Sequence, residues 1–219
     1  MSKTLRVVVP PHPLIGHWLT LLRDQGTPPA LFHTAMTELG RWLTYEALRD
    51  WVPYQRVQVQ TPLAATEGTV VDGSVPMLAV PLLRSGLALW EGARPVVPSA
   101  AVAHIGVNSG GDGTWFNGLP DQIPARSGVL VFAPQVASGS SLLHVLEQLE
   151  QRGVSGIRVR VITALTASPG LKRLGERYED LTLYTGCIDA ELDPEQRILP
   201  GFGDADQRLY GLEQTNFVG

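Results

Sequence analysis

The sequence predicts an α/β fold in which a largely parallel sheet is buried on both faces. Short, apolar, β-branched runs alternate with helical or loop segments through the second half of the chain, from PMLAVPLL to LTLYTG. Such alternation is typical of strand-helix-strand crossovers. Before these runs, apolar side chains spaced three and four apart over 31–51 predict a long amphipathic helix. With 219 residues, the chain is expected to form one domain, 1–219.

The composition excludes several classes of protein. The 17 lysines and arginines against 21 acidic residues give a net charge of -4, so no basic field is expected to hold nucleic acid or an anionic membrane. A single cysteine, Cys187, excludes an internal disulfide and a multi-cysteine zinc site. No segment approaches the ~20 apolar residues of a membrane span, and the N-terminus lacks a secretory signal pattern. We therefore expect a cytoplasmic protein.

The first half of the chain predicts two helices and a hairpin. A short strand over 5–9 precedes a first helix, whose apolar face carries Leu14 and Trp18. The longer helix, over 31–51, follows a proline-rich break. Alternation in RVQVQ and the turn residues after it predict an antiparallel hairpin over about 54–76. This β-arm either projects from the body or lies at the edge of the sheet.

Helices and loops are predicted between the strands of the second half. Ser140 or Ser141 is expected to cap a helix that ends near Gly153, and the dipeptide SP after RVRVITALTA opens a short helix. The glycine-rich NSGGDGTWFNG is expected to lack fixed structure, and the tail DPEQRILPGFGDADQRLYGL is expected to be a loop. Ligands of open α/β sheets bind at the carboxyl ends of the strands, so the loops there are the candidate site.

Two of these loops have the chemistry to bind phosphate. Arg84 follows a buried strand in PLLRSGLAL, where its guanidinium could bind a phosphate or pyrophosphate. The alternative is a surface arginine that pairs with a carboxylate. In APQVASGSS, backbone amides and serine hydroxyls at the start of a helix could surround a monophosphate. Capping of the helix without a ligand explains the same residues.

Two further segments carry side chains that could bind a metal ion or a sugar hydroxyl. Asp204 and Asp206 in PGFGDADQR could hold a magnesium-bound water or a sugar hydroxyl, or could simply form turns. His12 and His17 are five residues apart, a spacing that fits no familiar metal motif, and the other histidines are isolated. We therefore interpret the histidines as structural or surface residues, and expect no metal ligands from the protein.

Taken in order, the loops resemble those of the uracil phosphoribosyltransferases. The matching stretches span nearly the whole chain and are HPLIGHWLTLLRD, LTYEALRD, TPL, LLRSGLAL, PSAAVAHIGV, VLVFAPQVASGSS, CIDAELD and PGFGDADQRLYG. The resemblance implies a type I phosphoribosyltransferase fold: a parallel sheet flanked by helices, a hood made by N-terminal and C-terminal segments, and a β-arm used in dimerisation. It also implies a homodimer or a higher homo-oligomer.

The resemblance further implies a reaction and its residues. The family transfers ribose 5-phosphate from phosphoribosyl pyrophosphate (PRPP) to uracil, giving uridine monophosphate (UMP) and pyrophosphate in pyrimidine salvage, and Mg²⁺ is expected to be carried with PRPP. Arg84 and Asp204 look like the catalytic residues, and both look like PRPP contacts. The other PRPP-binding residues implied are Ala137, Ser138, Gly139, Ser140 and Ser141. The uracil-binding residues implied are Ile198, Gly203, Asp204 and Ala205.

The departures from the family pattern lie mainly in the PRPP loop, where the family has a sequence close to VLVLDPMLATGGS. Ala133 replaces the aspartate that would bind the ribose hydroxyls, and Ser109 stands where an arginine would contact pyrophosphate. One such charge-assisted contact contributes ~1.5 to 3 kcal/mol. The remaining replacements are His33, Gln135, Ser138, Ser140 and Arg197. The alternative function is therefore a weakened or inactive homologue that acts as a nucleotide-binding regulatory subunit or a protein-interaction subunit.

Overall fold

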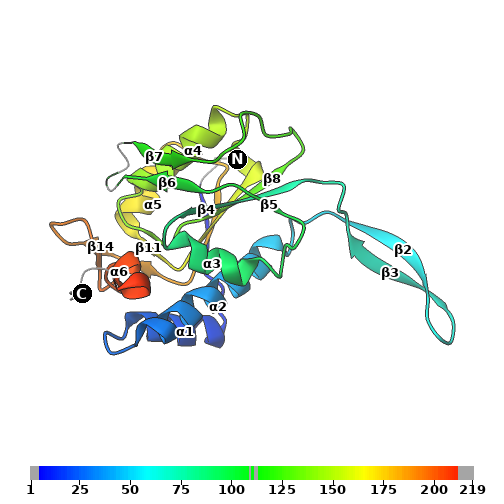
Figure 1. Cartoon of the computed structure of the whole chain (residues 1–219), viewed down its shortest axis with the longest axis horizontal. Coiled ribbons are helices and arrows are strands. Elements are labelled where there is room, and N and C mark those ends of the chain that lie inside the picture. Colours follow the sequence, from blue (N-terminus) through cyan, green and yellow to red (C-terminus); the bar gives the residue numbers. More distant parts are fainter. Residues whose placement is uncertain (1–4, 109, 111–112, 212–219) are drawn as a thin grey trace, which may run out of the picture.

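A mainly parallel sheet of eight strands forms the centre of the protein (Figure 1). The computed structural model describes residues 5–108, 110 and 113–211. The strands lie in the order β1-β12-β10-β8-β4-β6-β7, with β5 also paired to β4, and among them only β6 and β7 run antiparallel. Their bounds are β1 Arg6–Val8, β4 Met77–Leu83, β5 Ala101–Val102, β6 Ile105–Val107, β7 Thr114–Asn117, β8 Gly128–Phe132, β10 Val159–Thr163 and β12 Thr182–Thr185.

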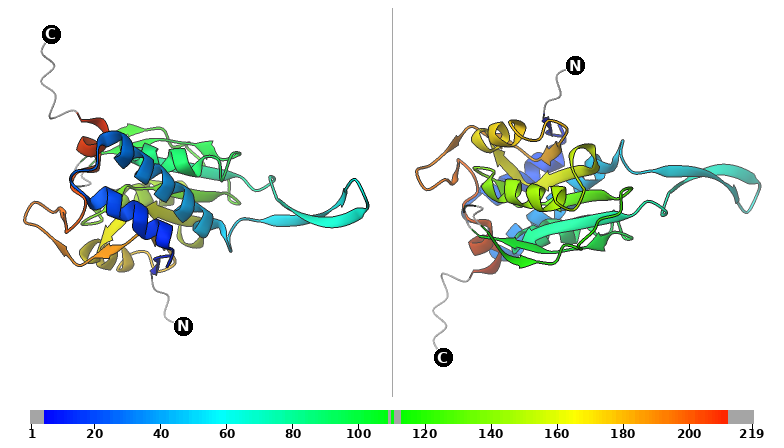
Figure 2. Two further views of the ribbon diagram at one scale, coloured as in Figure 1. Left: turned by 90° about the horizontal axis from the view of Figure 1, so that it is seen from below. Right: turned by 90° about the horizontal axis from the view of Figure 1, so that it is seen from above.

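Helices cover both faces of this sheet, which confirms the predicted α/β fold (Figure 2). In β8, Val129 and Val131 pack in the core beneath α4, whereas Phe132 packs in the core beneath α2. A strand buried on both faces needs a continuous apolar run, which is the pattern the sequence shows. The bounds of the larger helices are α1 Pro13–Arg23, α2 Pro29–Leu48, α3 Gly86–Ala93, α4 Ser140–Glu150 and α5 Ser168–Gly175. Among the described residues, no helix has both the length and the apolar character needed to cross a bilayer.

Helices α2 and α3 approach each other backbone to backbone at two glycines. A Cβ atom added to Gly40 would lie 2.0 Å from the carbonyl oxygen of Leu89, and one added to Gly92 would lie 1.7 Å from that of Thr37. Neither position has room for a side chain. The contact fixes the position of α3, which begins directly after the turn that carries Arg84.

The hairpin of β2 (Tyr54–Gln60) and β3 (Ala65–Val71) extends away from the body of the protein (Figures 1 and 2). Its two strands pair antiparallel in register from end to end. Apolar side chains are exposed along it, among them Tyr54, Val59 and Val71, and Leu63 at its tip is 97% exposed. The described chain therefore provides no core for this hairpin.

Short strands at the carboxyl ends of the main sheet extend the loops there. One group is parallel and has the order β13-β11-β9, and the other is the antiparallel pair of β14 and β15. The bounds are β9 Gln135–Val136, β11 Leu165–Ala167, β13 Ile188–Asp189, β14 Glu191–Leu192 and β15 Ile198–Leu199, with a 3-10 turn η1 at Gly156–Arg158. These short strands hold the segments that carry the candidate site.

Two segments expected to be irregular contain regular structure. Within NSGGDGTWFNG, β7 pairs with β6, and the Trp115 ring lies over Gly106, where an added Cβ atom would be 2.3 Å from it. The tail contains β15 and the helix α6, Ala205–Tyr210, whose N-cap is Asp204. Hairpin pairing in the first segment, and pairing with β14 and a cap in the second, order residues that have loop-like composition.

The prediction for the cap of α4 was also wrong. Its N-cap is Gly139, which has a left-handed φ of 80°, and no side chain hydrogen bond caps the helix. Ser140 is already the first helical residue, whereas the helix ends at Glu150 and the chain turns away at Gly153, near the expected end. Glycine adopts this φ without a Cβ penalty, so the chain turns tightly into the helix and the serine hydroxyls are left for other contacts.

Candidate active site

The 133–141 loop joins β8 to α4 and surrounds a cavity of about 480 Å³, here called the loop cavity. Side chains and backbone from the loop, the end of β4, α5 and the turn between β14 and β15 form its wall. The lining residues are Leu82, Gly110, Ala133, Gln135, Val136, Ala137, Ser138, Gly139, Ser140, Ser141, Leu142, Arg173, Glu195 and Gln196. All five residues that the resemblance assigned to this loop therefore line one cavity.

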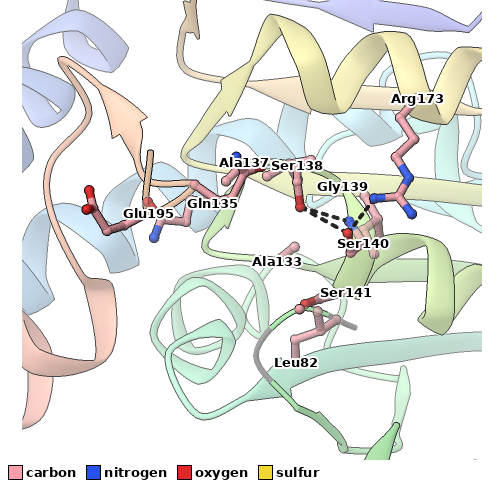
Figure 3. A pocket seen from close by; sticks show the side chains of 14 residues that line it. Leu82, Ala133, Gln135, Ala137, Ser138, Gly139, Ser140, Ser141, Arg173 and Glu195 are labelled. Atoms are coloured by element: carbon pink, nitrogen blue, oxygen red, sulfur yellow. Dashed lines mark hydrogen bonds between the residues drawn. The ribbon is translucent and has the colours of Figure 1, made fainter. Parts of the chain in front are cut away.

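A short chain of hydrogen bonds runs across the loop cavity (Figure 3). The Ser138 and Ser140 hydroxyls are 3.0 Å apart, and an Nη atom of Arg173 donates to the Ser140 hydroxyl at 2.6 Å. Arg173 belongs to α5 and was not identified in the sequence. Only its position three residues after the glycine of SPG could have suggested it, because residues three apart share one face of a helix.

Ala133 forms part of the wall where the family pattern has an aspartate. It is 2% exposed, and its backbone amide donates to the carbonyl oxygen of Ile162 at 3.0 Å. The side chain nevertheless lines the loop cavity, as does Gln135 next to it in the loop. Ala133 therefore borders the loop cavity while it is almost fully buried in the core, and its methyl group offers no hydrogen bond acceptor for a sugar hydroxyl.

A second cavity of about 230 Å³, here called the adjoining cavity, lies beside the loop cavity. The two share Leu82, Gln135 and Ser141 as lining residues. The other lining residues of the adjoining cavity are Leu83, Ser85, Pro134, Asp204, Ala205 and Asp206. The fold thus brings the ends of β4 and β8 together with the tail segment, although these parts are far apart in the sequence.

Arg84 pairs with Asp206 at the edge of the adjoining cavity. The Arg84 Nε atom donates to one carboxylate oxygen of Asp206 at 3.2 Å, and the Ser85 amide donates to the other at 3.0 Å. The Arg84 guanidinium also lies 5.4 Å from the centre of the Tyr210 ring. Arg84 therefore forms an ion pair with a carboxylate, which was the alternative to phosphate binding. That carboxylate belongs to Asp206, which itself lines the adjoining cavity.

Tyr210 completes the contacts around Arg84. Its hydroxyl donates to the Arg84 carbonyl oxygen at 3.1 Å. Burial raises the pKa of this hydroxyl, and the nearby Asp206 carboxylate raises it further. The protonated form, which can donate, is therefore favoured. Asp204 is fixed in the same segment because its side chain accepts from the Gln207 amide at 2.9 Å.

The segment before α6 is held to the rest of the protein by an ion pair. Two nitrogen atoms of Arg23 donate to the Asp189 carboxylate at 2.6 and 2.9 Å, and Arg23 also donates to the Gly201 carbonyl oxygen at 3.0 Å. Asp189 in turn accepts from the Gly201 amide at 3.0 Å. The hydrogen bond with Asp189 raises the pKa of Arg23, so this arginine stays charged.

Two of the residues implied for uracil binding lie outside both cavities. Ile198 is buried in β15 opposite Leu192, and Gly203 has a φ of 78° between that strand and α6. Neither lines the loop cavity or the adjoining cavity, whereas Asp204 and Ala205 line the latter. The structure therefore brings only part of this set to the surface of the two cavities.

Two other replacements, Arg197 and His33, lie close to acidic side chains. Arg197 forms ion pairs with Asp193 at 2.6 Å and with Glu195 at 3.2 Å, and does not line either cavity. His33 lies 3.0 Å from Glu91 on α3. Ser109 lies outside the described residues. Among the described residues, no group of three or more histidine, cysteine or acidic side chains is arranged to hold a metal ion.

Comparison with known proteins identifies the family. The family model for uracil phosphoribosyltransferase matches residues 9–212. The chain belongs to the uracil phosphoribosyltransferase family. It is 47% identical over 215 residues to the uracil phosphoribosyltransferase of Synechococcus elongatus, with 96% of this chain and 99% of that protein covered. The enzyme of the same name from Nicotiana tabacum is 39% identical over 209 residues, with 94% and 93% covered.

A solved structure has the same fold over nearly the whole chain. The AQ2163 protein from Aquifex aeolicus superimposes with a TM-score of 0.84 at 29% identity, covering 95% of this chain and all of that one. The resemblance found in the sequence is therefore confirmed, and so is the type I phosphoribosyltransferase fold of the uracil phosphoribosyltransferase family.

Proposed function

We propose that this protein is an active uracil phosphoribosyltransferase of pyrimidine salvage, which converts uracil and PRPP into UMP and pyrophosphate. The observation that carries the proposal is the pair of adjacent cavities, which share three lining residues. One is lined by the hydroxyl-rich 133–141 loop, and the other by Asp204 and Ala205. Membership of the family supports an enzymatic function, and does not favour the alternative function of an inactive regulatory subunit.

The reaction requires the protein to bind the charged groups of PRPP and to orient PRPP and uracil. In this family, the bond from the sugar to pyrophosphate breaks ahead of the bond to the uracil nitrogen, so positive charge develops on the ribose. Backbone amides of the 133–141 loop and its serine hydroxyls hold the 5-phosphate. Arg84 binds the departing pyrophosphate, and exchanges its carboxylate partner Asp206 for pyrophosphate oxygens. No side chain is required as a nucleophile.

Asp204 and the segment around it hold the sugar and the base. The Asp204 side chain lies at the wall of the adjoining cavity and is oriented by the Gln207 amide. We assign uracil recognition to backbone groups between Ile198 and Ala205, whose conformation is fixed through Gly201 by Arg23 and Asp189. A fixed backbone edge selects a flat base by the positions of its donors and acceptors.

Mg²⁺ would reach the site together with PRPP. The two aspartates nearest to Arg84 in the adjoining cavity are already engaged, Asp204 as the cap of α6 and Asp206 by Arg84 and Ser85. This donor set fits a metal held mainly by the oxygens of the substrate, which would neutralise the charge of pyrophosphate.

We further propose a homodimer or a higher homo-oligomer, and a cytoplasmic location. The exposed hairpin of β2 and β3 carries apolar side chains on a strand pair with no core of its own, and two-stranded hairpins are marginal in isolation. Sedimentation of the purified protein tests the oligomeric state: a dimer or a larger oligomer is expected, and a monomer at micromolar concentration contradicts the proposal.

The activity is tested by incubating the purified protein with radiolabelled uracil, PRPP and Mg²⁺. We expect labelled UMP to form, and we expect Arg84→Met to lower kcat/KM by about tenfold to hundredfold, because it removes a charge-assisted contact. Absence of UMP at high protein concentration would overturn the proposal. Binding of UMP without turnover would instead identify the regulatory subunit.

A further inference from the structure

We infer that Arg173 on α5 is a phosphate-binding residue, which supplies the positive charge of the loop cavity. The inference builds on the proposed function, because it takes the loop cavity as the place of the sugar 5-phosphate. Among the described residues that line this cavity, Arg173 is the only cationic side chain, and Glu195 is the only acidic one. A dianionic phosphate held by backbone amides and hydroxyls alone lacks a counter-charge within hydrogen-bonding distance.

A close backbone contact places α5 against the 133–141 loop. A Cβ atom added to Gly170 would lie 2.3 Å from the Ala137 carbonyl oxygen, and one added to Gly139 would lie 3.1 Å from the Gly170 carbonyl oxygen. The first turn of α5 therefore rests directly on the loop. Arg173 follows Gly170 by three residues and lies on the same face of the helix. The contact thus directs this side chain toward Ser140 (Figure 3).

The guanidinium of Arg173 has capacity left for a ligand. One of its Nη atoms donates to the Ser140 hydroxyl at 2.6 Å. No carboxylate among the described residues forms an ion pair with it, whereas Arg177, one turn further along, pairs with Glu147 at 2.7 Å. An arginine has five N–H donors in a planar fork that matches the geometry of phosphate oxygens. The remaining donors of Arg173 are therefore available at the wall of the cavity.

The acidic residue of the wall has a cationic partner of its own. The Glu195 carboxylate accepts from Arg197 at 3.2 Å, and Arg197 also pairs with Asp193 at 2.6 Å. Arg173, which forms no ion pair with a carboxylate of the described residues, is the cationic group available to a ligand in the loop cavity. Its contribution depends on the phosphate group of a ligand, and not on the base or on the sugar hydroxyls.

The experiment compares ligands that differ by the phosphate. Calorimetry at fixed ionic strength measures the affinity of the wild-type protein and of two variants for ribose 5-phosphate, UMP and uridine. Arg173→Met is expected to weaken binding of ribose 5-phosphate and of UMP by about tenfold or more, with uridine binding unchanged. Arg173→Lys, which keeps the charge but not the fork, is expected to lie between the wild type and Arg173→Met.

Lys172→Met is the matched control. It removes the same unit of charge from the neighbouring exposed position of α5, which does not line the cavity. Binding within twofold of wild type is expected for this variant. Equal losses in both variants would mean that the net charge of α5, and not a contact, attracts the ligand, and would overturn the inference. Thermal unfolding of each variant verifies that it is folded, which is expected because both side chains are exposed.

Failure of the inference and failure of the proposed function give different results. If the wild type forms UMP but Arg173→Met binds ribose 5-phosphate and UMP as tightly as the wild type, the inference about Arg173 is wrong. The proposed enzymatic function is still supported. If no UMP is formed but ribose 5-phosphate binds, and Arg173→Met weakens this binding, the proposed enzymatic function is wrong. The inference that Arg173 binds phosphate is then still supported. A wild-type protein that binds no phosphorylated ligand overturns both.

Discussion

The 133–141 loop and the segment from Ile198 to Asp206 meet at the adjoining cavity but are held by different kinds of contact. The loop is held by its backbone, through the glycine turn into α4 and the close approach of Gly170. The tail segment is held by side-chain charges, which are those of Arg23, Asp189 and Arg208. Arg208 donates to the carbonyl oxygens of Phe202 and Asp24, and its guanidinium lies 4.3 Å from the centre of the Phe32 ring.

This difference explains why the chain tolerates those departures from the family pattern that lie in the loop. A loop fixed by backbone packing keeps its shape when side chains change, and the replacements at Ala133, Gln135, Ser138 and Ser140 all lie there. A segment fixed by a few charged side chains loses its shape when one of them is removed, because a buried charge is then left unpaired. The two halves of the site should therefore respond differently to substitution.

The largest effect is expected from Asp189→Ala. Asp189 is 6% exposed and the paired Arg23 is 24% exposed, so the substitution leaves an arginine without its partner in a partly dry site. We expect a loss of about 3 kcal/mol of unfolding free energy, measured by urea denaturation, because breaking such a pair costs more than a surface pair. KM for uracil should rise more than KM for PRPP.

The matched control for Asp189→Ala is Glu67→Ala, which breaks an exposed ion pair with Arg56 on the β2–β3 hairpin. Little change in stability is expected, because exposed pairs contribute little. Equal losses for both substitutions would contradict the view that the tail segment depends on its buried charge.

Gly170→Ala tests the backbone contact on the other side of the site. The added Cβ atom would lie 2.3 Å from the Ala137 carbonyl oxygen, and this oxygen belongs to the backbone and cannot rotate away. We expect a loss of about 2 kcal/mol of unfolding free energy and weaker binding of ribose 5-phosphate. The control on the same helix is Gly175→Ala, whose Cβ atom would meet Leu5 at an ordinary 3.6 Å. If Gly170→Ala is as stable as this control, the loop does not depend on the contact.

Ala133→Asp tests whether the loop can hold the aspartate of the family pattern without rearrangement. The side chain lines the loop cavity, so a carboxylate there can accept from the ribose hydroxyls. We expect kcat/KM for PRPP to rise about tenfold, which corresponds to roughly 1.4 kcal/mol. Unchanged kinetics in a folded variant would show that the cavity wall has been reshaped beyond this one residue.

The smallest effect is expected from Asp206→Asn, which weakens the hold on Arg84. The pair is partly exposed, at 47% for Arg84 and 34% for Asp206, so its contribution is modest. We expect KM for PRPP to fall about threefold, because Arg84 no longer exchanges a carboxylate for pyrophosphate. An increase in KM would assign Asp206 to substrate binding instead.

The fold could be predicted because its signal is local and repeated. The apolar runs that became β4 and β8 are continuous, and the periodicity of α2 extends over 20 residues. The strand β7 and the helix α6 were missed because pairing with β6 and the cap of Asp204 order residues whose composition is that of a loop. Both partners are close in the sequence, and the glycines and aspartates around them give these stretches the composition of a loop.

The candidate site was predictable only where a continuous motif carries it. The residues of the 133–141 loop are consecutive, and they line one cavity. Arg173 was missed because its contact with Ser140 joins residues 33 positions apart, and the partner of Arg84 lies 122 positions away at Asp206. Both depend on how the ends of the strands meet, which no single stretch of sequence records.

The paired glycines of α2 and α3 limit how this enzyme scaffold can be altered. Arg84 takes its position from the start of α3, and α3 takes its position from two places where a side chain is missing. A directed-evolution library that seeks a new base specificity therefore has to keep Gly40 and Gly92 constant, although both lie outside the two cavities. Diversity is better placed at Gln135 and Ala205, which line the adjoining cavity.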